Sequence, residues 1–150
     1  MEYNKEIMEI KELISVVLIE ICNSNIDNCP YFVIDKYMNH KNYIKYLVSK
    51  VGSINFEFEI SDWGLTITID KAVDIYEYNI DFIRKNKKFI YDIIKTMLTS
   101  KIKVRSCYFD YYKYTFIDKN NKELFSCSFC ESIFCFIKVK CNTKIYNEYF

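Results

Sequence analysis

The chain has very little glycine and proline. Its 150 residues contain only two glycines, Gly52 and Gly64, and one proline, Pro30. Phosphate-binding loops and dinucleotide-binding turns need several closely spaced glycines, because the backbone must approach the phosphates without a Cβ atom between them. Neither motif can be written on this sequence. No linker rich in glycine or proline divides the chain either, so we expect residues 1–150 to form a single domain.

Histidine is equally scarce. The one histidine, His40, lies in a polar stretch between Asn39 and Lys41. An exposed histidine without a function is the simpler interpretation, although folding could bring His40 to any of the seven cysteines and form a nucleophilic pair. No pattern marks one thiol as activated, and carboxylate pairs assembled by folding leave no trace in a sequence. We therefore predict a protein that is not an enzyme and carries no cofactor.

Long hydrophobic runs are also missing. The apolar stretch from Leu13 to Ile21 is too short to span a bilayer and is interrupted by Glu20. The first twelve residues are richer in glutamate than in lysine, unlike the positive start of a secretory signal. These features predict a cytoplasmic protein with no membrane partner. In such a reducing compartment an odd number of cysteines is expected to remain as reduced thiols.

Four cysteines near the C-terminus could in number satisfy a zinc ion: Cys127, Cys130, Cys135 and Cys141. The surrounding sequence is typical of a β-strand, in which side chains three residues apart point to opposite faces. Zinc ligands must converge on one point. We therefore expect these cysteines to be buried as small apolar side chains, and no metal ion to be bound.

Three stretches carry apolar residues at steps of three and four, the spacing of one face of a helix. They cover residues 3–22, about 41–51 and 80–99. Gly52 follows the second stretch and would end a helix there. We expect three helices, and residues 31–40 remain unassigned because neither the helix nor the strand period dominates them.

Residues 53–70 alternate strictly between apolar and polar side chains, which is typical of half-buried strands. The intervening residues 61–64 include Asp62 and Gly64, both suited to a turn. The predicted hairpin places all apolar residues on one face and leaves Glu57 and Glu59 on the other. It pairs Ile60 with Leu65, Phe58 with Ile67 and Phe56 with Ile69.

Residues from about 102 to 141 have the pattern of an antiparallel meander. A loop at Asn120 and Asn121, followed by a turn near Glu131, would gather aromatic residues on one face. The predicted pairs are Phe116 with Phe125, Tyr114 with Cys127 and Tyr112 with Phe129, and the same face would continue through Phe134 and Phe136. The predicted class is therefore α+β: an antiparallel sheet, made of the hairpin of about 53–70 and the meander of about 102–141, with about three helices packed on one side.

The two halves of the chain carry opposite charge. Residues 1–82 hold 7 basic and 14 acidic residues and residues 83–150 hold 14 and 6, although the formal net charge is only +1. An acidic face with an exposed aromatic residue suits recognition of a basic protein, because opposite charge steers association and the aromatic ring can anchor it. We therefore predict a small, non-catalytic protein-binding domain, an inhibitor or immunity-type protein that neutralises a basic cytoplasmic partner. The candidate contact residues are Glu57, Glu59, Asp62, Trp63 and Asp70.

The basic half of the chain supports an alternative. Its cations concentrate in the predicted helix 80–99 and the strand after it, where they could contact the phosphates of a nucleic acid. Ordinary solvation of an exposed helix face would explain the same pattern. The candidate residues are Arg84, Lys87, Lys88, Lys95, Lys103 and Arg105. An open sheet edge would also allow homodimerisation.

Overall fold

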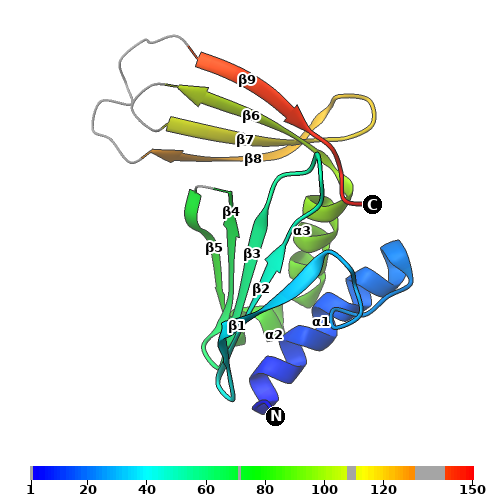
Figure 1. Ribbon diagram of the computed structural model, residues 1–150, viewed down its shortest axis with the longest axis vertical. Helices are drawn as coiled ribbons and strands as arrows, with labels where there is room; N and C mark the ends of the chain where they lie inside the picture. The colour runs from blue at the N-terminus through cyan, green and yellow to red at the C-terminus, as the bar shows by residue number, and fades with distance from the viewer. Residues whose placement is uncertain (1, 71, 108–110, 131–140) are drawn as a thin grey trace.

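The computed structural model describes residues 2–70, 72–107, 111–130 and 141–150 (Figure 1). It contains antiparallel sheets and helices and confirms the predicted α+β class. The hairpin and the meander were predicted to share one sheet, but they belong to two separate sheets. One sheet has five strands in the order β1-β2-β3-β4-β5, and the other has four in the order β8-β7-β6-β9. Figure 1 shows the four-stranded sheet lying across one end of the five-stranded sheet, with the helices on one side of the latter.

The five-stranded sheet is an up-and-down meander. The predicted hairpin forms its centre, and its register is confirmed pair by pair, since Phe56, Phe58 and Ile60 lie opposite Ile69, Ile67 and Leu65. These six side chains are all buried. The strands are β1 (Phe32–His40), β2 (Tyr43–Val48), β3 (Phe56–Ser61), β4 (Gly64–Ile69) and β5 (Ala72–Asn79).

The prediction of a helix over about 41–51 is wrong. Those residues contribute β2, in which Ile44, Tyr46 and Val48 are buried against the core. In so short a segment the apolar positions fit a period of two as well as a period of 3.6, and pairing with β3 decides between them. Gly52 does not end a helix but takes a left-handed conformation, with φ of 83°, in the turn before β3.

Three helices are described: α1 (Lys5–Cys22), α2 (Ile80–Lys85) and α3 (Lys87–Thr99). The first confirms the predicted stripe, because Ile7, Ile10 and Ile14 are fully buried. The continuous helix predicted over 80–99 is instead broken at Asn86. The side-chain amide of Asn86 donates to the carbonyl oxygen of Phe82 at 2.9 Å, which satisfies the end of α2 before α3 begins.

The four-stranded sheet follows α3. Its central register is confirmed, since Phe116 lies opposite Phe125, Tyr114 opposite Cys127 and Tyr112 opposite Phe129. The last strand pairs with β6 rather than with β8. The predicted turn near Glu131 and the residues Phe134 and Phe136 lie outside the described part of the chain. The strands are β6 (Lys101–Cys107), β7 (Tyr111–Ile117), β8 (Glu123–Cys130) and β9 (Cys141–Tyr146).

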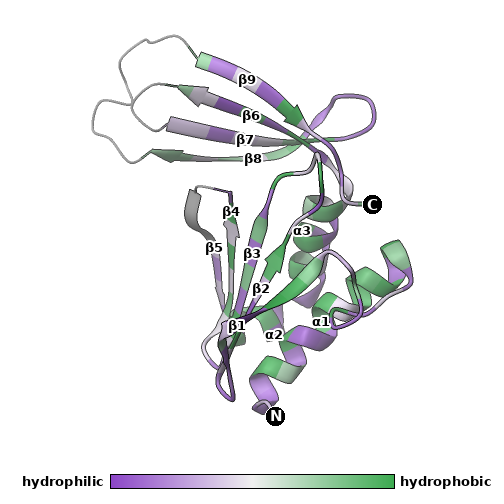
Figure 2. Ribbon diagram, in the orientation of Figure 1, coloured by the Kyte–Doolittle hydropathy of each residue, from purple (hydrophilic) through white to green (hydrophobic). Residues whose placement is uncertain are grey.

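One cluster of buried side chains joins both sheets to the helices. Hydrophilic and hydrophobic residues alternate along the first part of β6 (Figure 2), so this sheet turns one face inward and one outward. Ile102, Val104 and Tyr114 lie on the inward face. Among the described residues, no helix combines the length and apolar character needed to cross a bilayer.

The expectation of seven reduced thiols is wrong for one pair. Cys107 and Cys141 form a disulfide across β6 and β9, with their Cα atoms 4.2 Å apart. The two residues lie directly opposite each other in the strand register. Disulfides persist mainly in oxidising compartments, so this bond weighs against the reducing environment that the cytoplasmic expectation assumed.

Candidate functional site

The acidic hairpin residues do not stand alone. Glu57 and Glu59 lie on the face of β3 that points away from the helices, and Lys45 of β2 reaches both of them. The Nζ atom of Lys45 lies 2.5 Å from Glu57 Oε2 and 3.2 Å from Glu59 Oε1. One cation inside the chain therefore already offsets part of the charge that would attract a basic partner.

The other three candidate contact residues lie at opposite ends of β4. Asp62 and Trp63 form the turn between β3 and β4, whereas Asp70 follows the far end of β4. Because β4 has six residues, the two ends are separated by roughly 20 Å. Trp63 is 51% exposed. The five predicted contact residues therefore form a scattered set along the hairpin and not one compact patch.

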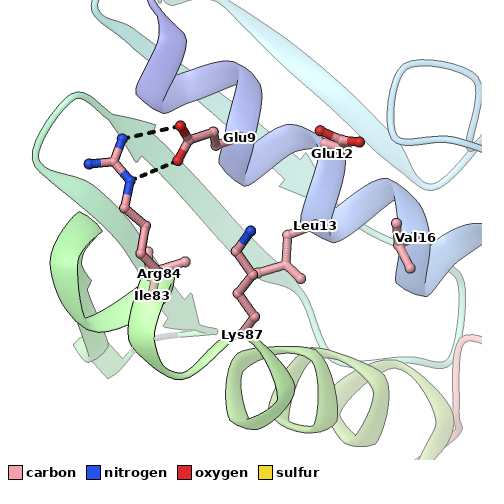
Figure 3. Close-up of a pocket in the computed structure, with 7 residues that line it drawn as sticks. All are labelled: Glu9, Glu12, Leu13, Val16, Ile83, Arg84 and Lys87. Atoms are coloured by element: carbon pink, nitrogen blue, oxygen red, sulfur yellow. Dashed lines mark hydrogen bonds and ion pairs between the residues drawn. The ribbon is translucent and has the colours of Figure 1, made fainter.

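Three of the five basic residues of α2 and α3 form ion pairs within the molecule: Arg84, Lys88 and Lys95. Arg84 of α2 donates from Nε and Nη2 to the carboxylate of Glu9 of α1, at 2.9 and 3.2 Å (Figure 3). Its Nη2 atom also lies 3.5 Å from Glu6 Oε1. Hydrogen bonding from Arg84 lowers the pKa of Glu9. Arg84 and Glu9 line a groove of about 220 Å³ between α1 and the helices α2 and α3, together with Ile83 of α2 and Lys87 of α3.

Two further helix cations also have carboxylate partners. Lys88 pairs with Asp92 one turn along α3, at 2.6 Å, and Lys95 forms an ion pair with Glu20 of α1. Part of the opposite charge of the two halves of the chain therefore forms ion pairs within the fold, because acidic α1 lies against basic α2 and α3. Four of the six predicted nucleic-acid contacts belong to this helix layer and lie apart from the remaining two.

Lys103 and Arg105 lie on the outer face of β6, in the four-stranded sheet. The register of that sheet brings a third cation beside them, since Lys113 of β7 lies directly opposite Arg105. Lys113 was missed by sequence reasoning, although the alternation of Ile102 and Val104 with charged residues would have placed Lys103 and Arg105 outward. The pairing of β6 with β7 was the missing information.

We call Lys103, Arg105 and Lys113 the basic triad. They line a depression of about 470 Å³ on the outer face of the sheet. Hydroxyl side chains lie in register with the triad: Thr143 opposite Arg105, and Ser128 opposite Lys113. The other residues that line the depression are Thr115, Ile117, Asn121, Glu123 and Ile145.

The basic triad is a cluster of cations that strand pairing gathers around one depression without a carboxylate partner among the described residues. Within the described ranges, no carboxylate forms an ion pair with any of its three members. Arg105 and Lys113 are like charges directly opposite each other on neighbouring strands, an arrangement that lowers sheet stability. Lys45, by contrast, lies opposite the carboxylate of Glu59. The triad is therefore a site where an anion from outside the chain would relieve repulsion.

The single histidine and the cysteines were the other candidates for a chemical site. The ring of His40 stacks on Tyr43, with centroids 5.6 Å apart. No three histidine, cysteine or acidic side chains in the described ranges are placed to share a metal ion. Cys127 is hydrogen-bonded to Tyr76, and burial raises the pKa of its thiol, which disfavours the reactive thiolate.

Comparison of the chain with protein-family models, with curated proteins and with solved structures found no match. The interpretation of the site therefore rests on its geometry and charge.

Proposed function

We propose that this protein is a non-catalytic binding protein that binds nucleic acid through the basic triad on the outer face of the four-stranded sheet. One observation carries the proposal: three clustered cations lack carboxylate partners among the described residues, whereas Arg84, Lys88 and Lys95 have them. Phosphate groups are the anions that such a cluster would contact in a nucleic acid, and they supply most of the sequence-independent affinity.

A matched pair of triple variants tests the proposal. The site variant is Lys103→Gln, Arg105→Gln and Lys113→Gln, and the control is Lys87→Gln, Lys88→Gln and Lys95→Gln on the helix layer, so both lose three positive charges. Binding to labelled RNA and DNA would be measured by fluorescence anisotropy at low salt. We expect the site variant to lose at least about tenfold in affinity, corresponding to 1.4 kcal/mol, and the control to lose much less.

Two results would contradict the proposal. One is an absence of binding by the natural protein at low salt, and the other is an equal loss in both triple variants, which would assign the effect to net charge. Thermal unfolding followed by circular dichroism would show that both variants are folded.

A second candidate function is protein binding through the acidic hairpin, as an inhibitor or immunity-type protein that neutralises a basic partner. The half-exposed indole of Trp63 beside Asp62 favours it, because an accessible aromatic residue can anchor a protein interface. A partner recovered from a native lysate would be retested with Trp63→Ala and with Glu57→Lys plus Glu59→Lys. Unchanged affinity in both variants would exclude this surface.

A further inference from the structure

We infer that the occupant of the basic triad is single-stranded nucleic acid, held by its sugar-phosphate backbone without selection for sequence. This inference rests on the proposed function and specifies the class of ligand. Three features of the outer face carry it: the small extent of the triad, the depression that the triad lines, and the row of hydroxyl groups beside it.

The triad is compact. Arg105 and Lys113 lie directly opposite each other, a separation of about 5 Å between Cα atoms, and Lys103 lies two residues along the strand, at about 7 Å. A duplex presents its phosphates on two backbones, separated by grooves about 6 and 12 Å wide. So small a cluster would contact only one of those backbones. A flexible single strand can instead bring consecutive phosphates to all three cations.

The depression favours a strand whose bases are accessible. Its inner part includes Thr115 and Ile117, which are only 9% and 6% exposed, and its margin includes Ile145, which is 56% exposed. A volume of about 470 Å³ lies within the usual range for small-molecule pockets. In a duplex the base faces are stacked and cannot reach such a recess. Unstacked bases of a single strand can contact the two isoleucines.

The hydroxyl groups extend the contacts available to a backbone. Thr143, Arg105, Lys113 and Ser128 lie in one row across the four strands. Hydroxyl side chains commonly donate to phosphate and sugar oxygens, and such contacts orient a strand without reading its sequence. Tyr111, opposite Cys107, lies on the same face two residues along β7 from Lys113, at about 7 Å, so its ring can stack on an unpaired base.

One carboxylate on the depression, that of Glu123, opposes an anionic ligand. Substitution of Glu123 therefore tests the inference by a gain of affinity, whereas the triad variants test it by a loss. Glu123→Gln should tighten binding of a single strand, since it removes repulsion without adding a contact. Glu2→Gln, an exposed substitution near the N-terminus, is the matched control for a change of one charge.

The deciding experiment compares three probes with the natural protein: a mixed-sequence oligonucleotide of about 12 nucleotides, its duplex with the complementary strand, and polyglutamate. We expect the single strand to bind at least about tenfold more tightly than the duplex. For three phosphate contacts the slope of log K against log salt should be about −2, and Lys113→Gln should reduce it to about −1.4. Substitution of one mixed sequence by another should change affinity little.

The outcomes separate the inference from the proposed function. Equal or tighter binding of the duplex would overturn the inference and leave the proposed function standing. Failure of both nucleic acids to bind would overturn the proposed function itself. Polyglutamate that competes as well as the single strand would show that the site does not select phosphates, which contradicts both.

Discussion

At the scale of single residues, Tyr149 has the clearest structural role. Its hydroxyl donates to the carbonyl oxygen of Ile54 at 2.6 Å and lies 3.0 Å from that of Val48, and the side chain is 2% exposed. Lys50 reinforces the same attachment by donating from Nζ to the carbonyl oxygen of Tyr149. The end of the chain after β9 is thus held against the five-stranded sheet and α3.

Removal of the Tyr149 hydroxyl should therefore lower stability. Tyr149→Phe leaves the carbonyl oxygens of Val48 and Ile54 without this donor in a buried site, which should cost about 1 to 3 kcal/mol of unfolding free energy. Urea unfolding would measure the loss. Tyr37→Phe is the matched control, because Tyr37 is 97% exposed and should have no effect. An unchanged urea midpoint for Tyr149→Phe would contradict the assigned role.

Buried tyrosines also predict loss of stability in alkali. Burial, aided at Tyr46 by a hydrogen bond to Asp27, raises the pKa of Tyr46 and Tyr149 well above the ordinary value of about 10. Below that pH both tyrosines are protonated in the folded and in the unfolded protein, so their contribution to the free energy of unfolding is fully present. Above it only the unfolded state ionises, so stability falls as the pH rises. Melting temperatures measured from about pH 8 to pH 11 should decline, and less steeply in Tyr46→Phe plus Tyr149→Phe.

At the scale of elements, the disulfide links the edge strand β9 to β6, its one neighbour among the described strands. The bond closes a loop with a sequence separation of 34 residues. In the chain-entropy description, such a crosslink contributes about 3 to 4 kcal/mol by restricting the unfolded chain.

Reduction of the disulfide should lower the unfolding free energy by about that amount, 3 to 4 kcal/mol. Denaturant unfolding with and without dithiothreitol would measure it. The variant Cys107→Ser plus Cys141→Ser should match the reduced protein and should not respond to the reductant. A natural protein that is equally stable in both conditions would show that the pair does not crosslink the chain in solution.

Elements differ in how far the sequence predicts them. The hairpin of β3 and β4 was predicted in its register, because only one register keeps Phe56, Phe58 and Ile60 on the same face as their partners. The identity of β2 was not predictable, since a six-residue apolar segment fits both periods. The break at Asn86 was equally hidden, because the apolar spacing continues through it while a side-chain hydrogen bond ends α2.

At the scale of the whole molecule, some cations of the basic half pair with the acidic half and, in the described part of the chain, others do not. The acidic face of α1 pairs with Arg84 and Lys95 from the later helices, and such exposed pairs contribute only about 0 to 1 kcal/mol each. The basic triad lies in the four-stranded sheet, which is distant from α1 (Figure 1). The candidate site is a cluster within the basic half that no ion pair among the described residues neutralises.

The sequence by itself determined the α+β class, the first helix and the two central strand registers, because local alternation of apolar and polar residues specifies which face is buried. It also contained Lys103 and Arg105 as candidates. Only the tertiary structure decided that Lys113 lies opposite Arg105, that Cys107 lies opposite Cys141, and that Arg84 is held by Glu9. These contacts join distant residues through the pairing of strands and the packing of helices, and no local period encodes them.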